Sequence, residues 1–111
     1  MKSLNNILRR IQDALLTVTE DCYHYRRPNS PKTHYIVWAE DSEAAAADAD
    51  NRKAGQQIHG TVDYYTLDEF DVNVDRIQEA LNFACIGFRI NSVQYEDETN
   101  LIHYEWEFWT A

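Results

Sequence analysis

Apolar residues recur along residues 3–18 at the spacing of a helix. They occupy positions i, i+3, i+4 and i+7, which predicts an amphipathic helix with one apolar stripe that packs on a sheet. Ser3 is a suitable N-cap for it. The same spacing predicts a second helix at about residues 72–84, capped by Asp71 or Asn73. The stripes are Leu4, Ile7, Leu8, Ile11, Leu15 and Val18 in the first helix, and Val74, Ile77, Leu81 and Ala84 in the second.

Four segments have the composition or the alternation of β-strands. Residues 34–38 are rich in β-branched and aromatic side chains, and residues 58–66 alternate between two faces. Residues 86–95 alternate with a change of phase at residues 91–92, which predicts a β-bulge or a shift of register. Residues 102–108 keep a strict period of two, which is typical of a half-buried antiparallel hairpin. One face of these strands carries Ile58, Val62, Tyr64, Ile102, Tyr104, Trp106 and Phe108, and the other His59, Thr61, Asp63, Tyr65, His103, Glu105 and Glu107.

The predicted order of elements is α-β-β-α-β-β in a single domain over residues 1–111. Two hairpins then form one four-stranded antiparallel sheet, and both helices pack on one of its faces, which makes a two-layer α+β domain. Residues 19–33 are expected to be a connector because they contain two prolines and turn residues. Residues 39–57 are rich in alanine and charge and contain no large apolar side chain. We expect them to form a mobile exposed loop with a functional or partner-ordered role.

Charge is unevenly distributed along the 111 residues, whose formal net charge is −9. Residues 1–32 contain six Lys and Arg against three Asp and Glu, whereas residues 63–111 contain two against eleven. This asymmetry suits a protein whose two faces meet different neighbours, although a merely acidic surface explains it equally well. Net negative charge repels DNA and anionic membranes, so we predict neither direct nucleic-acid binding nor membrane binding.

The sequence contains no recognisable catalytic, cofactor or metal motif. The four histidines form no HxH or HxxxH pair, and there is no phosphate-binding glycine loop or nucleophile elbow. Cys22 and Cys85 lack a metal or redox spacing and are expected as reduced thiols, with a disulfide between them as the alternative. Cys85 is expected to be a small core residue. Trp109 is out of phase with the aromatic residues before it. It is therefore a candidate interface anchor.

The stretch from Gly60 through Trp106 resembles the small tail-terminator or tail-completion proteins of long-tailed phages and of prophages of low-GC Gram-positive bacteria. The predicted element order agrees with that fold over nearly the whole chain. The residues that carry the resemblance are Gly60-Thr61-Val62-Asp63-Tyr64-Tyr65-Thr66, then Val74, Ile77 and Leu81, and the hairpin Asn91-Ser92-Val93-Gln94-Tyr95-Glu96 to Leu101-Ile102-His103-Tyr104-Glu105-Trp106.

The resemblance implies a virion structural protein without enzymatic activity or cofactor. Such a protein is made in the cytoplasm of the bacterial host and is located in the virion tail. There it caps or completes the tail tube as a ring, often hexameric, and joins the tail to the head-side connector. The implied partners are other copies of the chain, the tail-tube protein and the connector protein.

The acidic loop Glu40–Lys53 is a candidate to line the lumen of that ring or to become ordered against a neighbouring copy. A head–tail connector or neck component, and a small α+β binding or regulatory module, are the alternatives. An enzyme with a shallow carboxylate site is the least favoured. The candidate interface or lumen residues are Glu40, Asp41, Glu43, Asp48, Asp50, Arg52, Lys53 and Trp109.

Overall fold

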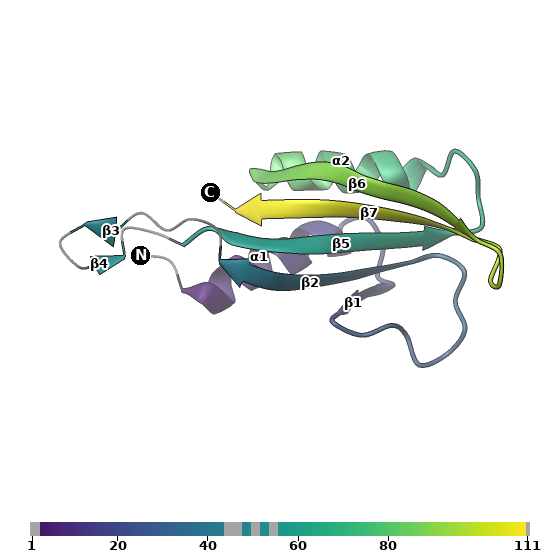
Figure 1. The fold of residues 1–111 in the computed structure, drawn as a ribbon, viewed down its shortest axis with the longest axis horizontal. Coiled ribbons are helices and arrows are strands. Elements are labelled where there is room, and N and C mark those ends of the chain that lie inside the picture. The colour runs from purple at the N-terminus through teal and green to yellow at the C-terminus, as the bar shows by residue number, and fades with distance from the viewer. Residues whose placement is uncertain (1–2, 44–47, 50–51, 54–55, 111) are drawn as a thin grey trace.

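A computed structural model of the protein describes residues 3–43, 48–49, 52–53 and 56–110. Two helices lie against one face of an elongated β-sheet, and the molecule is 52 Å long (Figure 1). The elements in chain order are α1 (Leu4–Leu16), β1 (Cys22–His24), β2 (Tyr35–Glu43), β3 (Asp48–Ala49), β4 (Arg52–Lys53), β5 (Ile58–Thr66), α2 (Val72–Phe83), β6 (Ile86–Glu96) and β7 (Leu101–Thr110).

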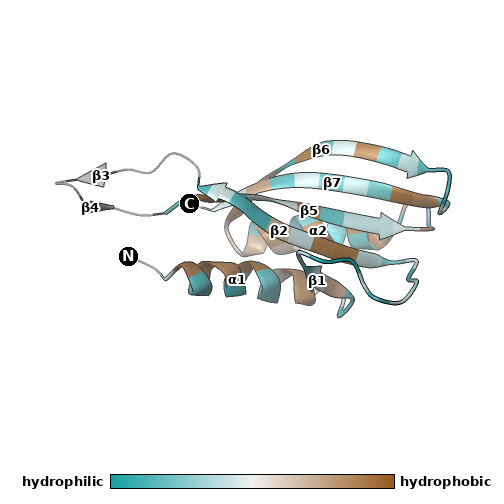
Figure 2. Cartoon of the chain, turned by 60° about the horizontal axis from the view of Figure 1, so that its bottom comes forward, coloured by the Kyte–Doolittle hydropathy of each residue, from teal (hydrophilic) through white to brown (hydrophobic). Residues whose placement is uncertain are grey.

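Both helices begin at the predicted caps. The Ser3 side chain accepts a hydrogen bond from the backbone N–H of Asn6 at 3.4 Å, and the Asp71 carboxylate accepts one from Asn73 at 2.8 Å. These bonds satisfy N–H groups that have no partner within the first turn of a helix. Apolar and polar positions alternate along α1 (Figure 2). The buried helix residues are Ile7, Ile11, Leu15, Ile77 and Leu81, whereas Leu4 is 42% exposed.

One apolar cluster fills the space between the helices and the sheet. Its centre holds Trp38, Trp106 and Phe108, none of which is more than 1% exposed. These large rings come from β2 and β7, and the Trp106 indole N–H donates to the Gln78 side chain of α2 at 3.0 Å. Because burial of such side chains is the main favourable term in folding, this face holds the domain together.

The prediction of a four-stranded antiparallel sheet is wrong. The sheet has five strands in the order β1-β2-β5-β7-β6, and β1 pairs with β2 in parallel, so the sheet is mixed. The fifth strand, β1, lies within the segment expected to be a connector. Three residues are too few to reveal a period of two, so the prolines that follow dominate the pattern.

Backbone hydrogen bonds and ring stacking hold β1 in place. The N–H of Tyr25 donates to Trp38 and that of Ile36 donates to Asp21, both at 2.8 Å. The imidazole of His24 stacks on the Trp38 indole with ring centroids 3.8 Å apart. The strand therefore depends on contacts with a segment some 14 residues later, which a local pattern does not report.

The expected loop over residues 39–57 is also partly wrong. Strand β2 continues to Glu43, paired with β5 across a bulge between Glu40 and Ser42. The ladder uses backbone groups, so polar side chains do not stop it. Strands β3 and β4 pair with each other beyond the end of the main sheet (Figure 1). Residues 44–47, 50–51 and 54–55 lie outside the described residues.

The C-terminal hairpin is confirmed, including its change of phase. Strands β6 and β7 pair antiparallel, and their register shifts between Ile90 and Ser92. Cys85 differs from the prediction, because it is exposed and has a left-handed backbone conformation (φ 59°) just after α2. Within the described residues, no helix is long and apolar enough to cross a membrane.

Candidate functional site

The sheet face turned away from the helices carries most of the polar chemistry. We define this open face by the side chains that alternate with the helix-facing ones along β2, β5, β7 and β6. The strand register makes neighbours on this face of residues that are far apart in the sequence. The open face includes Tyr35, Val37, Asp41, His59, Thr61, Asp63, Tyr65, Arg89, Glu96, Leu101, His103, Glu105, Glu107 and Trp109.

His103 lies between carboxylates on this open face. Its Nε2 is 2.6 Å from Oδ1 of Asp63, and its Nδ1 is 3.7 Å from Oε2 of Glu96. Asp63, His103 and Glu105 bring potential ligand atoms within 4.8 Å of one another. Imidazole and carboxylate are ligand types for Zn²⁺. Asp63 and His103 already hydrogen-bond to each other, so the group also makes a stable polar pair without an ion.

A second histidine, His59, lies toward the other end of the open face, opposite Trp109 in the strand register. Its Nδ1 is 2.9 Å from Oδ1 of Asp41, and its Nε2 is 3.7 Å from Glu107, which also pairs with Arg89 at 3.0 Å. The hydrogen bond to Asp41 raises the pKa of the His59 imidazole above its ordinary value. Partial burial acts to raise the pKa of Asp41, but its hydrogen bonds with His59 and Ser42 lower it overall.

Aromatic rings form a stacked column on the same face. Tyr35 stacks on Tyr65 at 4.6 Å, and Tyr65 stacks on His103 at 4.3 Å between centroids. The Arg27 guanidinium lies 5.0 Å from the Tyr65 ring centroid and donates to the Tyr65 hydroxyl at 3.0 Å. Burial is the main cause that raises the pKa of Tyr65 to about 12. The column extends apolar contact to one end of the open face, where Leu101 is also buried.

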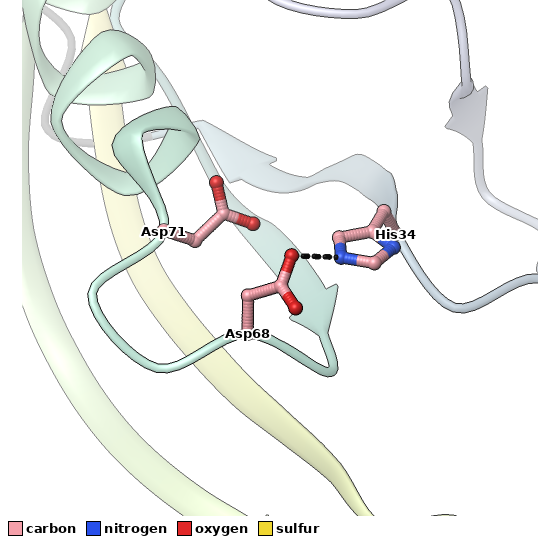
Figure 3. A group of neighbouring side chains, drawn as sticks. All are labelled: His34, Asp68 and Asp71. Atoms are coloured by element: carbon pink, nitrogen blue, oxygen red, sulfur yellow. Dashed lines mark hydrogen bonds and ion pairs between the residues drawn. The ribbon is translucent and has the colours of Figure 1, made fainter.

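A third group, His34, Asp68 and Asp71, lies at the start of α2 (Figure 3). The Nε2 of His34 is 2.8 Å from Asp68. Asp71 caps the helix, and its second oxygen accepts hydrogen bonds from the hydroxyls of Tyr64 and Thr66, both at 2.7 Å. Burial acts to raise the pKa of Asp71, whereas these hydrogen bonds lower it below the ordinary value. Both Asp71 oxygens are thus engaged in holding α2 on the sheet.

Three of the sequence-predicted interface residues, Glu40, Asp41 and Glu43, have hydrogen-bond partners in the structure. Glu40 lies 2.7 Å from Nε2 of His24 and accepts a hydrogen bond from the Tyr25 hydroxyl. Burial acts to raise its pKa, and these two hydrogen bonds lower it overall. Asp41 pairs with His59, as described above, and Glu43 accepts from the Gln56 amide at 3.2 Å. These three carboxylates therefore belong to the sheet and its edge rather than to a separate loop.

The remaining predicted residues lie at the end of the molecule or on the open face. Asp48 pairs with Lys53, and Ala49 with Arg52, in the β3–β4 ladder. Asp50 is outside the described residues. Trp109 is 38% exposed on the open face, and its indole covers Gly87, its partner on β6.

Sequence reasoning missed the histidine–carboxylate pairs although one signal was present. Asp63 and His103 were both assigned to the same face of their strands, forty residues apart. Only the register of β5 against β7, which places Tyr65 opposite His103, brings the pair together. All four histidines in fact have a carboxylate within 2.9 Å.

Comparison with known proteins identifies a similar fold but no family. No protein-family profile and no curated protein matches the sequence. Eight chains of solved structures match the fold. One belongs to the virion of a native gene transfer agent particle, with a TM-score of 0.55 over 93% of this chain and 88% of that chain. The two sequences are 11% identical, so the likeness concerns the fold.

Proposed function

We propose that this protein is a structural component of a phage-like virion that caps or completes the tail tube and joins the tail to the head-side connector. The strongest support is the fold likeness to a virion chain over 93% of this chain. The strand and hairpin residues between Gly60 and Trp106, which resemble tail-terminator proteins, add independent support. We also propose that it acts by assembly alone, without catalysis and without a cofactor.

Two properties of the surface support such an assembly role. Its net charge of −9 would keep a DNA passage free of adhesion. Large apolar side chains are exposed at several places, including Phe70 at 89% and Phe83 at 93%. Exposed apolar groups of this size favour contacts with other proteins. Other copies of the chain, the tail-tube protein and the connector protein are the proposed neighbours, in the tail of the virion.

Deletion of the gene from the genetic element that encodes it is the direct test. Electron microscopy is expected to find tail tubes of uncontrolled length and heads without tails, and the intact gene supplied in trans is expected to restore joined particles. Joined particles of normal length in the deletion strain would contradict the proposal. Tails of normal length beside unjoined filled heads would instead favour a neck component, the alternative that the gene transfer agent likeness supports equally.

The β3–β4 end of the molecule offers a test of the lumen. We propose that this end faces the DNA passage of the assembled ring, because β3 and β4 lie beyond the main sheet (Figure 1). Asp48→Lys together with Asp50→Lys is expected to slow DNA ejection from assembled particles, since added positive charge attracts DNA. The matched control is Asp97→Lys with Glu98→Lys at the β6–β7 turn. Ejection that changes equally in both double variants would contradict this placement.

A further inference from the structure

A groove of about 720 Å³ separates α1 from α2. Its half-buried lining is small and apolar, with Ala14 and Val18 on one side and Ala80 and Ala84 on the other. Phe83, 93% exposed, lies at its edge. Alanine side chains leave room for an incoming ring, so the groove has the shape and the chemistry to receive an aromatic side chain.

Two arginines in this groove have no partner within the described residues. The Nε of Arg10 is buried and forms no hydrogen bond there. Arg76, from α2, also lines the groove and forms no ion pair in the described part of the chain. Asp13 and Glu79 share the rim without pairing to either arginine. A buried donor without an acceptor is unfavourable. A ligand with a carboxylate or carbonyl oxygen would therefore be bound more tightly if that oxygen accepted a hydrogen bond from Arg10.

The turn between β5 and α2 has the complementary features. Phe70 is 89% exposed and has a left-handed backbone conformation, with φ 59°. Asp68 and Glu69 precede it, and Val72 beside it is 61% exposed. An aromatic ring exposed to water gains free energy when a partner buries it. The exposed Phe70 ring is therefore an unfavourable feature of the monomer that a partner would remove.

We propose that Phe70 of one copy of this protein docks in the α1–α2 groove of a second copy, with Glu69 beside Arg10 and Arg76. Within one chain the contact is absent, because the Phe70 ring is solvent-exposed. The positions also differ along α2, where Val72 and Ala80 are separated by about 12 Å at 1.5 Å per residue.

Two different patches that bind each other form a head-to-tail contact. Repetition of such a contact closes a ring or extends a filament, according to the rotation between copies. The inference deepens the proposed function, because it rests on the ring assembly and names its contact. Each copy would offer Phe70 to one neighbour and its groove to the other.

Two variants of the full chain test Phe70 and the groove separately. Phe70→Gly removes the ring and relaxes the left-handed backbone, so it is expected to fold at least as stably as the wild type. Ala80→Gln places a longer polar side chain in the groove while keeping a strong helix former. Each variant alone is expected to associate roughly 30-fold or more weakly than the wild type, the usual effect of losing an interface anchor. Val93→Thr, at an exposed apolar position of β6, is the matched control.

Light scattering after size exclusion, over a concentration series, tests this arrangement. The wild type and Val93→Thr are expected to form multiples of the 13.0 kDa chain mass. In a mixture of the two variants, Ala80→Gln keeps Phe70 and Phe70→Gly keeps the groove. The mixture is therefore expected to stop at a 1:1 dimer. Wild-type chains that stay monomeric to about 1 mM overturn the second copy as the occupant. Multimers that persist in Phe70→Gly overturn the choice of surface.

Cysteine cross-linking provides a second measurement that does not depend on tight association. With Cys85→Ser as background, Phe70→Cys combined with Glu79→Cys is expected to give a ladder of disulfide-linked chains, whereas Val93→Cys with Glu79→Cys gives none. Equal ladders from both pairs overturn the contact. A ladder specific to the first pair, together with normal particles after gene deletion, would leave the contact standing and remove the proposed virion function.

Discussion

The two faces of the sheet use the same strands for opposite purposes. The covered face packs the uncharged rings of Trp38, Trp106 and Phe108 against the helices. On the open face, by contrast, His59 and His103 are each held by carboxylates. Because neighbouring residues of a strand point to opposite sides, one face can be fixed by packing while the other is free to change its charge. Stability should therefore depend on the covered face and surface chemistry on the open one.

Truncation of Trp106, on the covered face, is expected to destabilise the protein most. Its ring is fully buried, and its indole N–H bonds to Gln78. Trp106→Ala is expected to lower the free energy of unfolding by about 3–5 kcal/mol, because it leaves a cavity and an unpaired amide. Chemical denaturation followed by circular dichroism measures this loss. The control is Trp109→Ala on the open face, and an equal loss there would contradict the division between the faces.

Substitution of two glycines that face aromatic rings is expected to give the next largest loss of stability. Each glycine lies opposite an aromatic partner on β7, Gly60 opposite Phe108 and Gly87 opposite Trp109. A β-carbon at Gly60 would meet the backbone oxygen of Ala39 and the buried Phe108 ring at 2.6 Å. Gly60→Ala is therefore expected to cost about 1–3 kcal/mol of unfolding free energy.

The Gly87 substitution supplies the comparison. A β-carbon at Gly87 would meet the Trp109 indole, which is 38% exposed and therefore less confined than the buried Phe108 ring. Gly87→Ala should therefore cost less than Gly60→Ala in the same denaturation experiment, with a change in tryptophan fluorescence that reports the movement of Trp109. The reverse order of stability would show that the open face is packed as tightly as the covered one.

Removal of the α2 cap tests how firmly the helices cover the sheet. Asp71 accepts hydrogen bonds from the Asn73 backbone and from the hydroxyls of Tyr64 and Thr66. Asp71→Ala is expected to cost about 1–2 kcal/mol in thermal or chemical unfolding, because it removes the cap and leaves two hydroxyls without this acceptor. Asp75→Ala, in the first turn of the same helix but not its cap, is the control. Equal effects would assign the loss to helix charge rather than to capping.

The titration of His59 should be the mildest change, confined to the open face. Its pKa lies above the ordinary 6.5 because of the hydrogen bond to Asp41. A pKa that is higher in the folded state stabilises the fold below the unfolded value, and this contribution disappears as the pH rises through the folded value. Asp41→Asn is expected to lower the His59 midpoint in an NMR titration, whereas Asp97→Asn leaves it unchanged. An unaltered midpoint in Asp41→Asn would contradict the pairing.

Local signals predicted much of the secondary structure. The Ser3 and Asp71 caps, the two helical stripes and the register shift near Asn91 are all confirmed. They are fixed by residues close in sequence, where a period of 3.6 or 2 and a capping side chain suffice. Cys85 shows the limit of this reasoning. Its place beside Ile86 indicated the core, but the turn after α2 directs it to solvent.

The candidate sites depended on contacts between distant segments. The open-face pair of Asp63 and His103 requires the register of β5 against β7, and the groove that holds Arg10 requires α1 to lie beside α2. The sequence contains every one of these side chains, yet their spacing along the chain has no relation to their distance in space. A motif search therefore finds no site, even where imidazole and carboxylate groups meet at 2.6 Å.

By itself, the sequence determined an acidic α+β chain with two capped amphipathic helices and a two-faced C-terminal hairpin, because each of these features arises from neighbouring residues. Only the tertiary structure decided that β1 joins the sheet in parallel, that β2 extends to Glu43, and that all four histidines have carboxylate partners. These outcomes follow from strand register and helix packing. Register and packing are settled by the free energy of the whole fold rather than by any local segment.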